Sequence, residues 1–337
     1  MMPKISDLRV STIVALALFT ALAVLPLFAV SFDQGYLIPL VARMIIFAIA
    51  TSALNLALGF GGMLSFGHAL FFGLGAYSVG LPAHFGIENG LLQLAICIGV
   101  TATAGFLTGA LSLRTSGFAF IMITLAFAQM GYFLFVSLKQ FGGDDGLVIQ
   151  NTSRFGSLDL GKPITAYFTA LLVLIMMTWW ISKLRVAPFG MALRASQQNS
   201  RRVNALGLKA SSYQLAAYVI SAAITGVAGF LSANLNAFAT PRIFSWHISG
   251  EMVLMLVLGG MGTVFGPVLG AIAYLGLEEI LRAYMQHWMM VFAPIIVLVA
   301  FISKGGFVAL LERLDQPRKK RDIAATPLKP GSAGELP

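Results

Sequence analysis

The chain has 337 residues, of which 58% are hydrophobic and only 10% are charged, and its mean hydropathy is +0.86. Soluble domains carry about 25% charged residues, so this composition excludes an ordinary soluble globular protein. The net charge of +9 comes from basic residues in short connections between apolar stretches, so it does not indicate a nucleic-acid-binding face.

Apolar stretches of about 20 residues, long enough to cross a bilayer as helices, recur along most of the chain. In chain order they cover about 11–30, 38–59, 64–84, 90–111, 117–137, 164–182, 213–236, 250–281 and 288–303. The first lacks a convincing small-x-small cleavage site and further stretches follow it, so we expect an uncleaved helix rather than a secretory signal. The predicted fold class is an all-α, polytopic membrane helical bundle.

The segment from Gly59 to Tyr77 contains six glycines, one serine and one histidine between long apolar helices. Inside a bilayer, a Gly-rich interruption frees backbone groups that must be buried in protein or line a cavity, so it indicates a translocation path. Polar residues in apolar surroundings strengthen this interpretation, although His68 can equally form a structural hydrogen bond between helices. The candidate pathway residues are Ser65, Gly67, His68, Gly73, Gly75 and Gln129.

Lysine and arginine indicate the orientation, because cytoplasmic connections carry an excess of both. The connection 183–212 holds six basic and no acidic residues, and four basic residues follow one another at 318–321. We therefore expect both of these, and the N-terminus with Lys4 and Arg9, to be cytoplasmic. Arg114 is then cytoplasmic too, and the charge-balanced connection 138–163 lies outside.

This orientation requires the stretch 250–281 to enter and return, because a single pass would leave the basic tail outside. Glycine tolerates a turn and proline removes a helix hydrogen bond, so the centre of the stretch is a suitable break. The residues of this predicted re-entrant hairpin are Gly259, Gly260, Gly262, Gly266 and Pro267. The prediction is about ten membrane segments with broken helices; the alternative is one long tilted helix.

Small residues four apart predict close helix packing, because they share one helix face. The pairs are Gly105 and Gly109, Ala222 and Gly226, and Thr225 and Gly229, and a triplet consists of Gly262, Gly266 and Gly270. Arg43 near a span end is expected to extend to the interface. Glu251, Glu278 and Glu279 are also expected to be interfacial.

The motifs of several enzyme classes are missing from the sequence. It has no phosphate-binding G-x-x-x-x-G-K-[ST], and its four histidines show no metal-ligand spacing. The single cysteine, Cys97, excludes a disulfide framework. Nothing in the sequence asks for catalytic residues, a cofactor or a metal, although an intramembrane enzyme stays possible.

Residues 187–207 predict a basic amphipathic helix that begins with a Pro-Phe-Gly turn. Such a helix can lie on lipid headgroups or dock in a groove of a partner; the alternative is a solvated loop. Phe189 is the candidate apolar anchor, with arginines at the rim of the contact. The candidate docking residues are Pro188, Phe189, Gly190, Arg194, Arg201, Arg202 and Gly207.

Five blocks of sequence, in order between about Arg43 and Phe301, resemble the LivM-type permease subunit of branched-chain amino acid ABC importers. They are "GGMLSFGHALFFGLGAY", "RTSGFAFIMITLAFAQM", "FGGDDGL", "PFGMALRA" with "ALG", and "SGEMVLMLVLGGMGTVFGPVLGA". In that family, residues 187–207 correspond to a coupling loop that fits a cleft on a separate ATPase subunit. The family usually has an acidic residue near Asn199 or Ser200, and this chain does not.

The resemblance implies an importer subunit in the bacterial inner membrane. Residues 1–315 would form the permease domain, with 187–207 as the coupling helix, and 316–337 a basic, disordered tail. The implied partners are a LivH-like second permease subunit, two ABC ATPase subunits, a periplasmic substrate-binding protein and membrane lipid. The implied substrates are branched-chain or related hydrophobic amino acids; urea, short amides and aromatic acids are alternatives. An ion-coupled secondary transporter and a channel are more distant alternatives.

Overall fold

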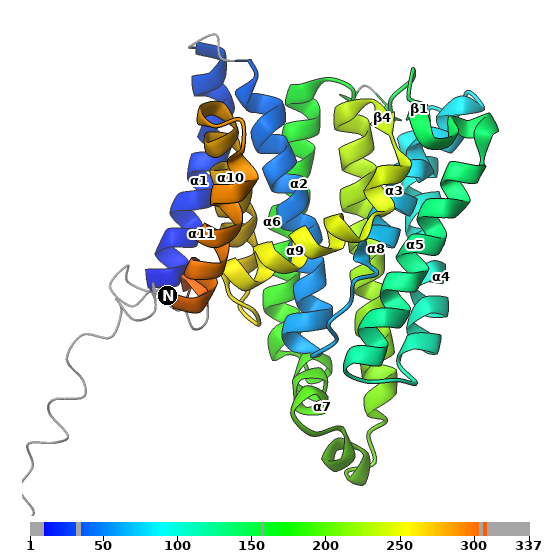
Figure 1. Ribbon diagram of the computed structural model, residues 1–337, viewed down its shortest axis with the longest axis vertical. Coiled ribbons are helices and arrows are strands. Elements are labelled where there is room, and N and C mark those ends of the chain that lie inside the picture. Colours follow the sequence, from blue (N-terminus) through cyan, green and yellow to red (C-terminus); the bar gives the residue numbers. More distant parts are fainter. Residues whose placement is uncertain (1–9, 32–34, 157, 303–305, 309–337) are drawn as a thin grey trace, which may run out of the picture.

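The computed structural model describes residues 10–31, 35–156, 158–302 and 306–308, and the described chain is all-α (Figure 1). Its helices are α1 (Val10–Ser31), α2 (Leu37–Asn55), α3 (His68–His84), α4 (Gly90–Ser112), α5 (Phe118–Ser137), α6 (Pro163–Val186), α7 (Pro188–Ala205), α8 (Ala210–Asn236), α9 (Trp246–Gly259), α10 (Gly266–Tyr284) and α11 (Trp288–Ile302). Short 3-10 helices cover Lys139–Phe141, Gly143–Asp145 and Pro241–Phe244. Lys4, Arg9 and the predicted tail 316–337 lie outside the described residues.

The predicted apolar stretches coincide with helices. Among the described residues, five helices are long and apolar enough to cross a membrane: Leu37–Phe60, Gly90–Ser112, Phe118–Ser137, Pro163–Val186 and Ala210–Asn236. The stretch 250–281 is divided into α9 and α10 at Gly260–Phe265, so the predicted break is confirmed. The stretch 64–84 is helical only from His68 onward, because the chain is irregular between Gly61 and Gly67.

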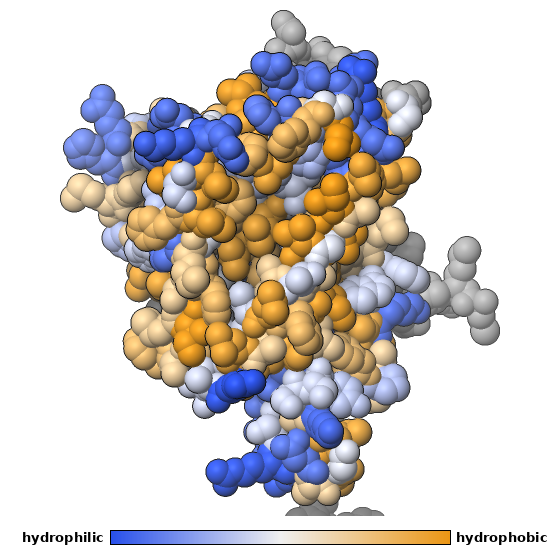
Figure 2. All heavy atoms as spheres, turned by 90° about the vertical axis from the view of Figure 1, so that its right-hand side faces the viewer, coloured by the Kyte–Doolittle hydropathy of each residue, from blue (hydrophilic) through white to orange (hydrophobic). Residues whose placement is uncertain are grey.

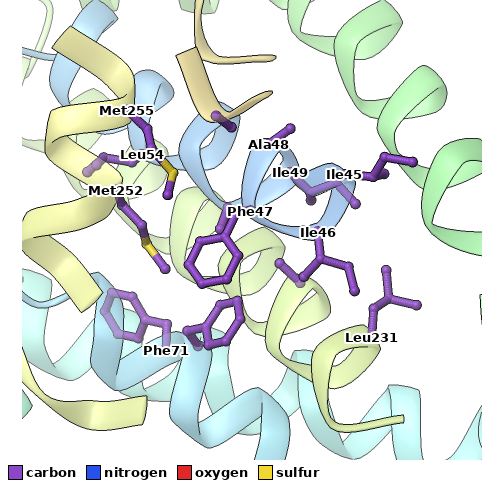
Figure 3. Close-up of a cluster of buried hydrophobic side chains, with 14 of the residues drawn as sticks. Ile45, Ile46, Phe47, Ala48, Ile49, Leu54, Phe71, Leu231, Met252 and Met255 are labelled. Atoms are coloured by element: carbon purple, nitrogen blue, oxygen red, sulfur yellow. The ribbon is translucent and has the colours of Figure 1, made fainter. Parts of the chain in front are cut away.

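Helix α2 lies in the interior of the bundle and is buried along nearly its whole length. Figure 3 shows its side chains, among them Ile46, Phe47 and Ile49, between Met252 of α9, Phe71 of α3 and Leu231 of α8. A helix that is apolar on all sides is stable only when surrounded by other helices or lipid. Helix α2 is surrounded by other helices, and this placement brings its C-terminal end against α8 and α9.

Helices α4 and α5 cover one side of the bundle, and each is buried along a single stripe. On α5 the stripe consists of Phe120, Thr124, Ala128, Gly131 and Phe135. The opposite faces expose large apolar side chains such as Phe106, Leu107, Phe133 and Leu134. Figure 2 shows this side as an apolar belt with hydrophilic residues at both ends, as a lipid-facing surface requires.

Helix α8 packs backbone-to-backbone against α3 and α4 through the predicted small residues. A Cβ on Gly229 would overlap the carbonyl group of Phe72 on α3. A Cβ on Gly226 would meet Thr101 of α4, and one on Gly105 would lie 2.6 Å from the Cβ of Ala222. The prediction of close helix contacts at these positions is confirmed, and the contacts leave no room for a larger side chain.

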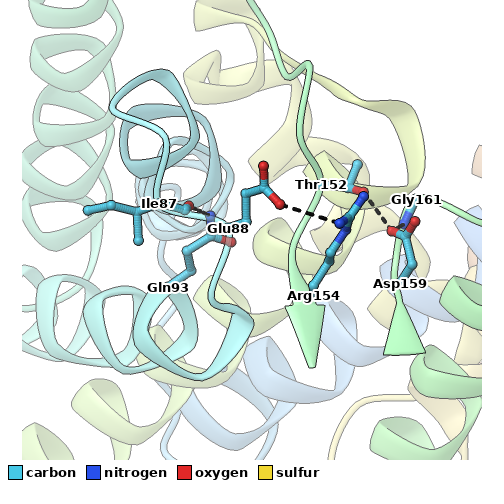
Figure 4. A network of polar contacts seen from close by, with 7 residues as sticks. All are labelled: Ile87, Glu88, Gln93, Thr152, Arg154, Asp159 and Gly161. Atoms are coloured by element: carbon cyan, nitrogen blue, oxygen red, sulfur yellow. Dashed lines mark hydrogen bonds and ion pairs between the residues drawn. The ribbon is translucent and has the colours of Figure 1, made fainter. Parts of the chain in front are cut away.

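Two short antiparallel pairs join the connections at the end of the molecule opposite α7 (Figure 1). Strand β1 (Leu147–Val148) pairs with β4 (Phe238–Ala239), and β2 (Arg154–Phe155) pairs with β3 (Leu158–Asp159). Arg154 also lies 3.6 Å from the carboxylate of Glu88 (Figure 4). These pairs tie the α3–α4 and α5–α6 connections to the end of α8.

Candidate translocation and coupling sites

The helix that begins with α2 is interrupted at its C-terminal end. A five-residue π-helix, Leu56–Phe60, follows α2, and an irregular segment leads from Gly61 to Gly67 before α3 begins at His68. Gly62 has φ +70°, a left-handed conformation that glycine adopts without strain. We call residues 61–67 the first interruption.

Side chains of two other helices bind the backbone groups that the first interruption leaves free. The Phe66 N–H donates to Oγ1 of Thr124 on α5 at 3.2 Å. The Ala69 N–H donates to Oγ of Ser249 on α9 at 2.9 Å, and this hydroxyl donates to the Phe66 carbonyl at 2.7 Å. Non-helical backbone at membrane depth is stable only when protein satisfies it in this way.

His68 is fully buried and joins α3 to α8. Its Nε2 lies 2.8 Å from Oγ of Ser221, and that hydroxyl donates its own proton to the carbonyl oxygen of Ala53. The Ser221 oxygen can therefore only accept from the imidazole, so Nε2 of His68 carries a proton and Nδ1 is an acceptor. Nδ1 has no hydrogen-bond partner in the structure. The structural hydrogen bond that the sequence offered as an alternative is present.

Ser65 is also fully buried, with its hydroxyl 3.2 Å from that of Tyr218 on α8 and accepting from the Gly67 N–H at 3.1 Å. Gly73 lies against the ring of Phe244, and a Cβ on Gly75 would overlap the backbone of Gly226.

Ser65, Gly67, His68, Gly73 and Gly75 are thus enclosed by packed neighbours, where the sequence predicted the edge of a wet cavity. Gln129 lies on α5 and is half-buried. Glycine at these positions permits close backbone contact, which is a packing reason for the Gly-rich composition. Their role in a translocation pathway stays a prediction.

The second interruption, residues 260–265, joins α9 to α10. Gly260 and Gly262 have φ of +118° and +74°, and Pro267 stands in the first turn of α10. A Cβ on Gly259 would overlap the carbonyl of Gly266, and one on Gly270 would overlap that of Met255. The glycines therefore let the two helices of the hairpin touch along their backbones.

Asn55, the last residue of α2, binds the second interruption. Its Nδ2 donates to the Thr263 carbonyl at 2.7 Å, and its Oδ1 accepts from the Gly262 N–H at 2.9 Å. Both groups of the amide side chain are satisfied by backbone. Asn55 thus ties the end of α2 to a segment that is 207 positions away in sequence.

The predicted helix at 187–207 is α7, which projects from one end of the bundle (Figure 1). Pro188 occupies its first turn, and a Cβ on Gly190 would overlap the Leu184 carbonyl, so glycine permits the close approach of α7 to α6. Gly207, at φ +82°, ends α7 in a Schellman motif with N–H to carbonyl bonds from Gly207 to Asn204 and from Leu208 to Val203.

Asn199 divides α7, because its backbone is not helical (φ −160°, ψ 96°). Its side-chain oxygen accepts from the Arg202 N–H at 3.0 Å, which is the bond an N-cap residue makes to the first turn of a helix. Aspartate caps equally well. The departure from the acidic residue of the resembling family at this point therefore leaves the local fold unchanged.

The candidate docking residues of α7 differ in their surroundings. Phe189 is half-buried and contacts the ring of Tyr213, and Arg194 donates to the Arg185 carbonyl at 2.9 Å. Arg201 and Arg202 are exposed. Sequence reasoning missed two exposed apolar side chains, Met191 at 52% and Leu206 at 75%. The exposed side chains of Met191, Arg201, Arg202 and Leu206, the residue that follows α7, are together called the outer face below.

A charged cluster between α2, α9 and α10 was also missed. Glu278 was expected at the interface, but it is only 6% exposed and accepts a 2.6 Å ion pair from Arg282. Glu251 is half-buried within electrostatic range of this pair and of Arg43. The spacing of Glu278 and Arg282, four residues apart on one helix, was the available signal.

Comparison with known proteins agrees with this architecture. The family described as branched-chain amino acid transport system / permease component matches residues 36–301. The high-affinity branched-chain amino acid transport system permease protein LivM of Escherichia coli K12 is 28% identical over 289 residues, covering 79% of this chain and 68% of LivM.

Two more distant relatives differ in what their names say they transport. A probable branched-chain amino acid transport permease protein LivM of Methanocaldococcus jannaschii is 24% identical over 82% of this chain and 94% of the relative. The autoinducer 2 import system permease protein LsrC of Shigella flexneri is 24% identical over 69% of each chain. No solved structure matches significantly. The family match covers most of the chain, so the protein belongs to the branched-chain amino acid transport permease family and is a multi-pass membrane protein.

Proposed function

We propose that this chain is the permease subunit of an ABC importer for branched-chain or related hydrophobic amino acids. The observation that carries the proposal is the family match over residues 36–301, with LivM proteins among the relatives. The similarity to LsrC shows that the same architecture serves other solutes, so urea, short amides and aromatic acids are the alternatives to test.

In this proposal a LivH-like subunit completes the pathway, two ATPase subunits supply energy and a periplasmic binding protein delivers the substrate. Helix α7 is the coupling helix, because it projects from the bundle and carries the exposed outer face Met191, Arg201, Arg202 and Leu206. Exposed apolar and basic side chains suit a groove that offers apolar contacts and acidic edges.

The pathway opens, in this proposal, at the first interruption. Ser65 and His68 are held by single hydroxyl partners on α8, and the imidazole keeps a free acceptor at Nδ1. A movement of α3 against α8 would expose these polar groups to a central cavity that Gln129 of α5 adjoins. Alternating access requires such elements with two discrete arrangements.

The proposed topology has α7 and both termini in the cytoplasm and about ten membrane segments. The basic connection 183–212 and the position of the α4–α5 turn at the same end as α7 support it (Figure 1). The hairpin of α9 and α10 then enters and leaves without crossing, and the β1–β4 and β2–β3 pairs face the periplasm.

Reconstitution tests the proposal. The four-subunit complex is reconstituted in proteoliposomes and supplied with its binding protein and radiolabelled leucine. Leucine transport should require ATP on the side of the membrane on which α7 lies. Collapse of ion gradients should leave uptake intact. Uptake that follows an ion gradient, or a purified chain that retains no ATPase subunit, would contradict the assignment to an ABC importer. Competition by urea, short amides and aromatic acids then defines the substrate.

Docking variants test the role of α7. Met191→Asp with Leu206→Asp should abolish leucine uptake and release the ATPase subunits, because both apolar contacts are lost. Phe189→Asp with Ala205→Asp, and Gly190→Trp, should do the same by displacing α7 from Tyr213 and Leu184. Val148→Asp, an exposed apolar position at the opposite end, is the control and should retain uptake.

A further inference from the structure

Gln197 of α7 lies directly over Gly62 of the first interruption. A Cβ built on Gly62 would lie 2.8 Å from Cγ of Gln197 and 3.6 Å from its Cβ and Cδ. The aliphatic stem of the glutamine therefore packs against the glycine backbone. Both residues are at the surface of the bundle, so this contact joins α7 to the interruption without passing through the core.

Two backbone hydrogen bonds join Gly62 and Met63 to the π-helix that precedes them. The Gly62 N–H donates to the Leu58 carbonyl at 2.9 Å, and the Met63 N–H donates to the Ala57 carbonyl at 3.0 Å. Both acceptors belong to the π-helix, which therefore moves with Gly62. Single π-turns inside helices occur frequently at functional sites.

Asn55 lies at the start of the same π-helix and holds the second interruption by two hydrogen bonds. A Cβ on Gly59, inside the π-helix, would meet both the Asn55 side chain and the Gly262 N–H, so the π-helix packs closely against the second interruption there. Displacement of the π-helix must therefore displace Gly262 and Thr263 as well, or break these bonds.

We propose that Gln197 is the positioning residue through which a displacement of α7 reaches both interrupted helices, by way of Gly62 and the Asn55 side chain. The proposal rests on the proposed function, because it needs α7 to be the helix that the ATPase subunits move. It differs from the proposed function because it concerns a contact that one side chain of α7 makes with the bundle, and not the outer face that docks on the ATPase subunits.

Neighbouring residues of α7 provide the comparison. Gln198 is exposed and follows Gln197 directly in sequence, while Ser196 is buried and donates to the Leu193 carbonyl of its own helix. Gln197→Ala removes the stem over Gly62. Gln197→Met keeps a stem of similar length without the amide, and Gln198→Ala removes an equal side chain at the next, exposed position.

The test uses the complete four-subunit complex in proteoliposomes with the binding protein, ATP and radiolabelled leucine. For Gln197→Ala we expect the number of leucines carried per ATP hydrolysed to fall about tenfold, with the ATPase subunits still bound and ATP still hydrolysed. Gln197→Met and Gln198→Ala should retain the ratio of the unaltered complex. An unchanged ratio in Gln197→Ala, or an equal fall in Gln198→Ala, would overturn the proposal.

A second readout follows the interruption directly. Leu64→Cys is placed in a Cys97→Ala background, which removes the single native cysteine. Its rate of maleimide labelling should change when ATP is added to the complex, and Gln197→Ala should abolish that change. Persistence of the change in Gln197→Ala would overturn the proposal. If the unaltered complex neither binds ATPase subunits nor takes up leucine, the proposed function itself fails, which is a different result.

Discussion

Asn55 and Thr263 are 208 positions apart in the chain, yet Nδ2 of the asparagine donates a 2.7 Å hydrogen bond to the threonine carbonyl. The same side chain accepts from the Gly262 N–H, so one amide ties the end of α2 to the second interruption. A buried polar group left without its partner costs about 1–3 kcal/mol, which makes this contact measurable.

Asn55→Ala should therefore lower the thermal unfolding temperature of the purified protein, because it leaves the Gly262 N–H and the Thr263 carbonyl unpaired. The expected loss is about 2 kcal/mol or more. Asn236→Ala, at the exposed end of α8, is the matched control and should change the melting temperature little. Equal melting temperatures for the two variants would show that Asn55 does not hold the hairpin.

Gly75→Ala should destabilise the packing of α3 on α8, because the added Cβ would overlap the backbone of Gly226. Overpacking of this kind costs about 1–3 kcal/mol. Gly99→Ala on α4 is the control, since no atom lies within 4 Å of its added Cβ and alanine favours a helix by about 1 kcal/mol. Thermal unfolding in detergent should separate the two, and a tolerated Gly75→Ala would contradict the close contact.

Arg114→Cys tests the orientation of the chain in the membrane. In a Cys97→Ala background, a membrane-impermeant maleimide added to intact cells should not label position 114, which is exposed in the α4–α5 turn. Asp144→Cys, exposed in the connection at the opposite end, should be labelled under the same conditions. Labelling at 114 without labelling at 144 would invert the proposed topology.

Asp159 predicts a pH dependence confined to the outer connection. The Gly161 N–H and the Thr152 hydroxyl, at 2.9 and 2.8 Å, lower the pKa of this carboxyl below its usual 3.8 (Figure 4). A carboxylate with a lowered folded pKa stabilises the fold above its unfolded pKa, and the contribution is lost as pH falls through the folded value. The turn should therefore be protected at pH 5–7 and should loosen below about pH 4.

Hydrogen exchange of residues 150–162, corrected for intrinsic rates, measures this change. Asp159→Asn should remove the acid-dependent step, because the amide does not titrate in this range. Asp144→Asn, an exposed carboxylate of the same connection, should retain the step. A step that persists in Asp159→Asn would assign it to another group.

The sequence by itself determined the helical membrane fold, the approximate positions of the apolar helices, the break between α9 and α10 and the basic helix at 187–207. These follow from local properties: apolar run length, glycine and proline at a break, and lysine and arginine in connections. Small residues four apart also predicted the close packing of α8, because helical spacing places them on one face.

Only the tertiary structure decided which groups meet. Nothing local in the sequence pairs His68 with Ser221, Asn55 with the second interruption or Gln197 with Gly62. The tertiary structure also places Phe189 against Tyr213 and leaves Leu206 exposed, although Phe189 and Leu206 are both apolar residues of the predicted amphipathic segment 187–207. The physical reason is that hydrogen bonds and van der Waals contacts act over a few ångströms, so they depend on how distant helices pack and not on chain spacing.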